Sequence, residues 1–112
     1  MSQQEVKIEG VLVLDQPAEI EGAHIAVELR DTGMADVPRK LIGQMRGRIS
    51  GAGIKSIPFH IDARVEPGRS YTLAAEVRRG PALAPGDLLN VASHPWRAGD
   101  VNPVMIELKP IS

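Results

Sequence analysis

The strongest constraint on the fold is a period-two alternation of apolar and polar residues that recurs along the chain. Successive side chains of a β-strand point to opposite faces, so this alternation predicts strands with one buried face. Gly10 interrupts the first such segment, which is typical of a bulge or bend. Seven segments carry the pattern, at residues 6–14, 23–31, 39–49, 54–62, 70–79, 87–94 and 104–111.

Seven short strands separated by proline- and glycine-rich turns predict an all-β fold. We expect a seven-stranded antiparallel β-sandwich of immunoglobulin-like or transthyretin-like type. A chain of 112 residues suits one domain, so we expect a single domain over 1–112 with residues 1–4 disordered. The glycine-rich "SGAG" is expected to form a hairpin loop. Pro38 and two glycines limit "GMADVPRKLIGQM" to a short helical turn at most.

The stretch "ARVEPGRSYTLAAEV" places a proline–glycine turn just before the single tyrosine. In sandwich folds, a tyrosine near the start of a late strand packs its ring in the core, and its hydroxyl hydrogen-bonds to backbone a few residues upstream. The spacing of Pro67 and Tyr71 predicts such a tyrosine corner. We also expect structural roles for Asp31, as a turn cap, and for Pro58 and Phe59.

The residue types that carry catalysis or bind metals are sparse. The chain has no cysteine, which excludes disulfides, thiolate metal ligands and cysteine catalysis. His24, His60 and His94 lack the close spacing of a metal-binding pair. Ile54, rather than glycine, precedes Lys55, so the glycine-rich loop there is not a phosphate-binding loop. We therefore expect no enzymatic activity, no catalytic residues, no metal and no cofactor.

Charge and composition limit the partners. The net charge is −1 and only three residues are aromatic, so we expect no nucleic-acid binding. No apolar run approaches the roughly 18 residues of a membrane span, so we expect no direct membrane insertion. The start "MSQQEVKIEG" lacks the features of a signal peptide. We expect a cytoplasmic location for the chain as written, or the cell envelope if a leader was removed, and a monomer or weak dimer.

Opposite charges gather in different parts of the chain. Residues 1–36 hold eight acidic and two basic residues, whereas residues 37–79 hold nine basic and three acidic ones. One interpretation is that these charges meet on paired strands of one sheet. The other is a basic face for an acidic partner.

The basic segment at residues 39–49 is expected to be an edge strand. Arg39, Lys40, Arg46 and Arg48 crowd it with positive charge. These bases either guard the edge against aggregation or attract an acidic extended segment of a partner. The sequence leaves both interpretations open.

Trp96 lies in the connection "HPWRAGDVNP". We favour the interpretation that it plugs one end of the sandwich. The alternative is an exposed platform of His94, Trp96 and Arg97 that binds a small ligand or carbohydrate.

The runs "GAHIAVELRDTGMADVP" and "IPFHIDARVEPGRSYTLAAEVRR", with the short strand ending in "SHPW", resemble the YbaY/YscW-type family. Its members are small bacterial envelope lipoproteins and include type III secretion lipoprotein chaperones, also called pilotins. The resemblance covers residues 6–108 and implies a β-sandwich, no enzymatic activity and binding of a protein partner. This sequence lacks the lipobox cysteine of the lipid-anchored members. The residues that carry the likeness are Leu29, Asp31, Ala35, Asp36, Pro38, Ile57, Pro58, Phe59, Pro67 and Tyr71.

Residues and resemblance together lead us to expect a non-enzymatic β-sandwich interaction module that binds a protein or peptide partner. The alternative is the small-ligand or carbohydrate-binding sandwich that would use the region of Trp96.

Overall fold

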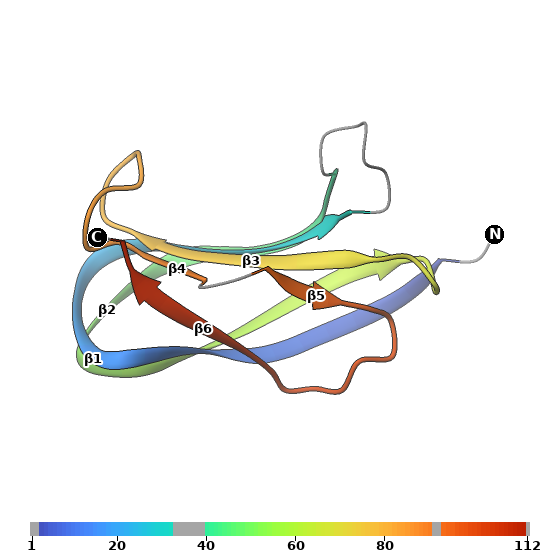
Figure 1. Ribbon diagram of the computed structural model, residues 1–112, viewed down its shortest axis with the longest axis horizontal. Helices are drawn as coiled ribbons and strands as arrows, with labels where there is room; N and C mark the ends of the chain where they lie inside the picture. The colour runs from blue at the N-terminus through green and yellow to red at the C-terminus, as the bar shows by residue number, and fades with distance from the viewer. Residues whose placement is uncertain (1–2, 33–39, 91–92, 112) are drawn as a thin grey trace.

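The computed structural model describes residues 3–32, 40–90 and 93–111 (Figure 1). This part of the chain contains no helix, so the all-β prediction is confirmed, and no helix there could cross a membrane. Gln4, the last of the four residues predicted to be disordered, is the first residue of a strand. The described residues form six strands, which are β1 (Gln4–Asp31), β2 (Lys40–Val65), β3 (Tyr71–Arg78), β4 (Leu88–Asn90), β5 (His94–Trp96) and β6 (Val104–Pro110).

The strand count differs from the predicted seven because two pairs of expected strands are continuous, whereas the expected strand at residues 87–94 is replaced by the two short strands β4 and β5. β1 has 28 residues and β2 has 26, and the two pair antiparallel from end to end. The expected turn at residues 15–22 and the expected "SGAG" hairpin are bends inside these strands, where the pairing register shifts. Gly22 and Gly53 have φ of 58° and 64°, a conformation that glycine adopts without steric cost and that helps both strands to bend together.

The sheet also closes on itself, which a purely antiparallel sandwich does not do. β1 pairs antiparallel with β3 and parallel with β6, and β4 joins β3 to β6. Strands β1, β6, β4 and β3 therefore form a closed four-stranded barrel, with β2 and β5 as the two outer strands. Because β1 bends, its two halves pair with different strands, the first half with β6 and the second half with β3.

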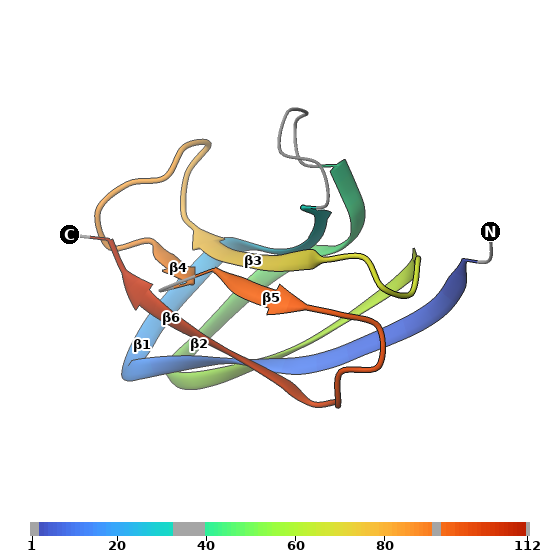
Figure 2. The ribbon, with the colours of Figure 1, turned by 45° about the vertical axis from the view of Figure 1, so that its right-hand side comes forward.

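The bent β1–β2 pair gives the molecule two layers, which Figures 1 and 2 show from two directions. One layer holds the first half of β1, the second half of β2, and β6. The other holds the second half of β1, the first half of β2, and β3 with β5. The core between them is mainly aliphatic and includes Ile8, Leu12, Leu14, Ile25, Val27, Leu29, Ile57, Phe59, Ile61, Leu73, Val77, Val104, Ile106 and Leu108.

Gly10 is an inward position of β1 and not a bulge. It pairs with Phe59 in unbroken register, between the buried residues Ile8 and Leu12. A side chain on Gly10 would collide with the Phe59 ring and with the backbone oxygen of Val104. The glycine therefore makes room for a core aromatic ring and for the close approach of β6.

Candidate functional site

The corner before β3 has the hydrogen bond that the sequence predicts. Tyr71 is 3% exposed, and its hydroxyl oxygen accepts from the backbone N–H of Glu66 at 2.8 Å. The N–H of Arg69 donates to the Glu66 carbonyl at 3.2 Å. Pro67 and Gly68, with φ of 87° at the glycine, occupy the central positions of this turn, as in a type II turn.

Asp31 is the last residue of β1, and the turn that it is predicted to cap lies in residues 33–39, outside the described residues. Its carboxylate pairs with the Arg69 guanidinium at 3.0 Å, and Arg69 also contacts Glu66 at 3.3 Å. The hydrogen bond to Glu66, and then the charge of Asp31, raise the pKa of Arg69. Arg69 thus ties the end of β1 to the turn that precedes β3.

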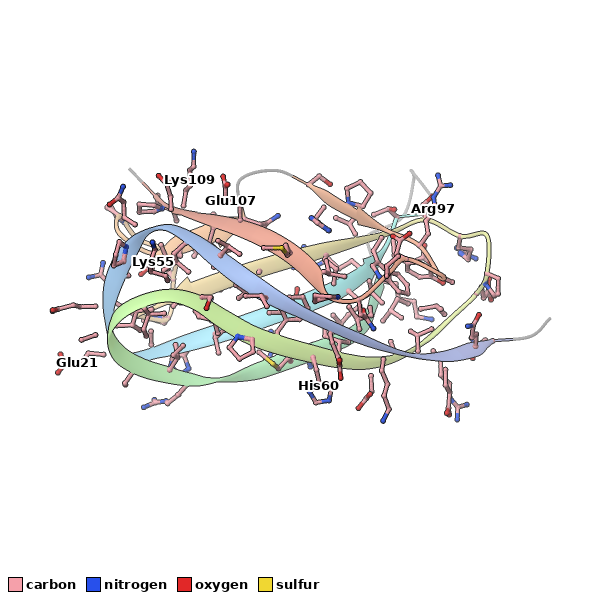
Figure 3. All side chains as sticks on the ribbon, turned by 90° about the horizontal axis from the view of Figure 1, so that it is seen from below. Glu21, Lys55, His60, Arg97, Glu107 and Lys109 are labelled. Atoms are coloured by element: carbon pink, nitrogen blue, oxygen red, sulfur yellow. The ribbon has the colours of Figure 1, made fainter. Side chains whose placement is uncertain are left out.

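The alternative ligand platform of His94, Trp96 and Arg97 is not assembled as an exposed surface. Trp96 ends β5, is 3% exposed and packs edge-on against Tyr71 with ring centroids 6.1 Å apart. His94 is half-buried on the same short strand, where it pairs with Leu73. Arg97 is exposed (Figure 3), and its backbone N–H donates to Asp100. The burial of Trp96 favours the plug interpretation.

Asp87 was missed from the sequence, where it reads as one more turn residue in "GPALAPGD". The structure buries it to 2% exposure. Its carboxylate accepts from the N–H of Ala84 at 2.9 Å and from the N–H and Nε of Arg79 at 3.2 and 3.3 Å. Burial raises the pKa of this carboxyl, but the hydrogen bonds from Ala84 and Arg79 outweigh burial and leave the pKa below its ordinary value.

We expect Asp87→Asn to lower the melting temperature at pH 7 because it removes the charge that these donors stabilise. A carboxyl whose folded pKa is depressed contributes stability above its unfolded pKa of about 3.9, and this is lost as pH falls through the folded pKa. The Tm difference between wild type and variant should therefore shrink at acid pH, measured by thermal melts across the range. Asp15→Asn, at an exposed position, is the control. A Tm difference that is constant from pH 7 to acid would contradict the assignment.

β2 is the long open edge of the sheet. It pairs only with β1 among the described strands, whereas the opposite outer strand, β5, has three residues. An open edge exposes backbone N–H and C=O groups that another strand can pair with. The expectation that the basic segment lies at an edge therefore agrees with the strand order.

The second half of β2 is a poor template for another strand. Pro58 has no N–H to offer, and its place opposite Val11 is one that proline takes on edge strands. The first half of β2 also passes close to this second half, near Ile61 and Asp62. A Cβ on Gly43 would lie 2.8 Å from the Ile61 side chain and 3.2 Å from the Asp62 carbonyl oxygen.

The first half of β2 offers a more regular stretch. Residues 43–49 pair with residues 23–29 of β1 without a register shift. Ile42 is an extra residue, a bulge, at one end of this stretch, and the bend lies beyond Ile49 at the other end. We call residues 43–49 the open segment.

The basic residues differ in their surroundings. Arg46 pairs with Glu28 of β1 at 3.2 Å, so part of the charge separation is neutralised across paired strands. Within the described ranges, Arg48 has no ion-pair partner. Lys40 begins β2 and is exposed, and Arg39 lies outside the described residues.

Several grooves border the first half of β2. One of about 870 Å³ lies between the start of β1 (residues 3–7) and the two ends of β2 (residues 40–42 and 62–64). A second of about 630 Å³ is bordered by Met45 together with Pro58, Phe59 and His60. A third of about 310 Å³ lies on the outer face, where Arg46 and Arg48 meet residues of β1 and β3.

The three histidines are not brought together. His24 lies on β1, His60 projects from β2 beside Asp62 (Figure 3), and His94 lies on β5. Among the residues that the structure describes, no three histidine, aspartate or glutamate side chains could jointly hold a metal ion. The geometry therefore offers a backbone edge with basic side chains as the candidate site.

No protein-family model matches the chain, and no curated protein matches it. A solved structure does match, described as that of an alternative pilotin from the type II secretion system of Vibrio cholerae. Its TM-score is 0.76 at 15% sequence identity, over 97% of this chain and 99% of that one. The chain therefore has a pilotin-like fold. Membership of the YbaY/YscW-type family stays a prediction.

Proposed function

We propose that this chain is a non-enzymatic interaction module that binds a protein or peptide partner. The observation that carries the proposal is the open segment of β2, a regular run of strand edge that pairs on one side with β1 and on the other side with no described strand. Addition of a partner strand to such an edge is a common mode of peptide recognition.

The pilotin-like fold supports the same proposal, because the similar structure is described as a secretion-system pilotin. We propose a partner of that general kind, a protein component of a bacterial secretion or envelope assembly. The competing role for Arg46 and Arg48 is protection of the edge against aggregation. That role predicts no partner that depends on these two side chains.

A pull-down from the native host separates the two roles. Wild type is compared with the double variant Arg46→Glu, Arg48→Glu, and with Lys55→Glu, Lys109→Glu as a control of equal charge change at two exposed positions away from the open segment (Figure 3). We expect a protein that wild type and the control capture and that the Arg46, Arg48 variant loses. Identical captured sets from all three proteins would assign Arg46 and Arg48 to protection of the edge, and capture no better than from bare resin would overturn the proposal.

A further inference from the structure

We infer that the partner presents an extended segment in which acidic and apolar residues alternate, and that this segment pairs with residues 43–49 of β2. The inference rests on the proposed function and specifies the partner's chemistry. It follows from what lies on each side of the open segment, since side chains of an added strand alternate between the two faces of the sheet.

The outer face of the open segment is basic. Gln44, Arg46 and Arg48 are exposed there at every second position. Residues directly opposite on neighbouring strands have their Cβ atoms about 4.5–5.5 Å apart, so acidic residues of an added strand could pair with these arginines. The partner's outward positions should therefore be glutamate or aspartate.

Arg48 is the stronger of the two arginine positions. It pairs in register with His24 of β1, and His24 pairs in turn with Arg78 of β3, whose guanidinium is bound to Glu76 at 3.2 Å, so Arg48 is the arginine of this row that has no ion-pair partner among the described residues. Arg46 instead lies in a row with Ala26 and Glu76, and its guanidinium is already bound to Glu28. The acidic residue opposite Arg48 should therefore contribute most to binding.

The inner side of the open segment calls for apolar residues. Met45 points to this side, and the groove of about 630 Å³ beside it is lined by apolar residues, Pro58, Phe59 and Pro103, and at its border by Lys7, Glu9 and His60. Gly47 adds no side-chain bulk there, whereas the Ile61 side chain already occupies the space beside Gly43. The alternate residues of an added strand would cover this groove, and apolar side chains there would be removed from water.

A second copy of this chain is a poor occupant for the same edge. Antiparallel pairing of two open segments around a twofold axis near residue 46 places Arg46 opposite Arg46, and a shift by two residues places it opposite Arg48. Like charges directly opposite each other destabilise a strand pair. Charge complementarity therefore favours an acidic partner over self-association.

The test uses synthetic peptides and the full chain. A fluorescent peptide that alternates glutamate with valine is compared with one of equal composition whose glutamates are gathered at one end, and with an alternating lysine–valine peptide. Binding is measured by fluorescence anisotropy, and amide hydrogen exchange locates the protected backbone. We expect only the glutamate–valine alternation to bind wild type well, with new protection within residues 43–49.

Two variants make the test specific. Arg48→Glu should lower the affinity for the glutamate–valine peptide by about three- to tenfold, because one favourable cross-strand pair becomes a repulsive one. The same variant should raise the affinity for the lysine–valine peptide, because the repulsive pair there becomes a favourable one. Lys55→Glu, which changes the net charge equally, should shift affinity by less than about twofold because surface charge is screened over about 10 Å.

Equal binding of the alternating and the gathered peptides, or protection outside residues 43–49, would overturn the inference. The inference would also be overturned if wild type captured a native partner but did not bind the glutamate–valine peptide. That outcome would leave the proposed function standing. Failure of wild type to capture any protein above bare resin overturns the proposed function instead.

Discussion

Tyr71→Ala is expected to lower the free energy of unfolding by about 3–5 kcal/mol, as truncations of large buried aromatic residues do. The ring is 3% exposed and packs edge-on against Trp96, so its removal opens a cavity that Trp96 helps to line. Its hydroxyl also holds the Glu66 N–H at the corner before β3. Urea titration followed by tryptophan fluorescence measures the change, because Trp96 is the single tryptophan.

Tyr71→Phe separates the hydroxyl from the ring. It keeps the packing but leaves the partly buried Glu66 N–H without its acceptor, which costs about 1–2 kcal/mol. Ser70→Ala is the matched control. Ser70 is exposed, and its hydrogen bonds from Thr32 go to its backbone carbonyl oxygen, which alanine keeps. A Tyr71→Phe protein as stable as wild type would show that the hydrogen bond does not stabilise the corner.

The tyrosine corner was predictable because it is local. Pro67, Gly68 and Tyr71 lie within five residues, and each has a preference that acts without distant contacts, namely a fixed φ, a positive φ and a large ring next to a turn. The same holds for the strands themselves, since alternation follows from the pleat of a single strand. These features therefore needed only a short stretch of sequence.

The closure of the sheet was not predictable in this way. Whether residues 15–22 reverse the chain or only bend it depends on the partner strand, because β1 and β2 bend together and stay paired through the irregular region. The parallel pairing of β1 with β6 joins residues 10–14 to residues 104–108, far apart in the sequence. Glycine and proline signal an interruption but do not say whether the chain turns back.

The candidate site shows the same division. The basic character of residues 39–49, and the place of residues 40–49 at an edge, could be inferred from composition, since edge strands carry charge as protection. The sequence could not show that Arg46 binds Glu28, whereas Arg48 lies in a row with His24 and Arg78. Asp87 was missed because its burial depends on Arg79 and on the fold of the connection between β3 and β4.

Gly10→Ala is expected to destabilise the chain by about 3 kcal/mol, at the upper end of the usual cost of overpacking a core. The new methyl group would meet both the Phe59 ring and the Val104 carbonyl oxygen. An aromatic ring can shift within the core, but the carbonyl oxygen belongs to the backbone where β6 pairs with β1. We therefore expect β1 and β6 to separate locally, with faster amide hydrogen exchange over residues 104–108 in addition to the lower stability.

Gly47→Ala is the matched control on the partner strand. A Cβ at Gly47 would lie 3.8 Å from the Ile25 side chain, an ordinary packing distance. With no steric cost, the loss of glycine's freedom in the unfolded chain should make this variant neutral or more stable by up to about 1 kcal/mol.

Combining Gly10→Ala with Phe59→Leu should relieve only the ring contact, because the Val104 oxygen stays in place. If the double variant recovered full wild-type stability and normal exchange in β6, the ring alone would account for the glycine. The close approach of the Val104 backbone would then not constrain position 10.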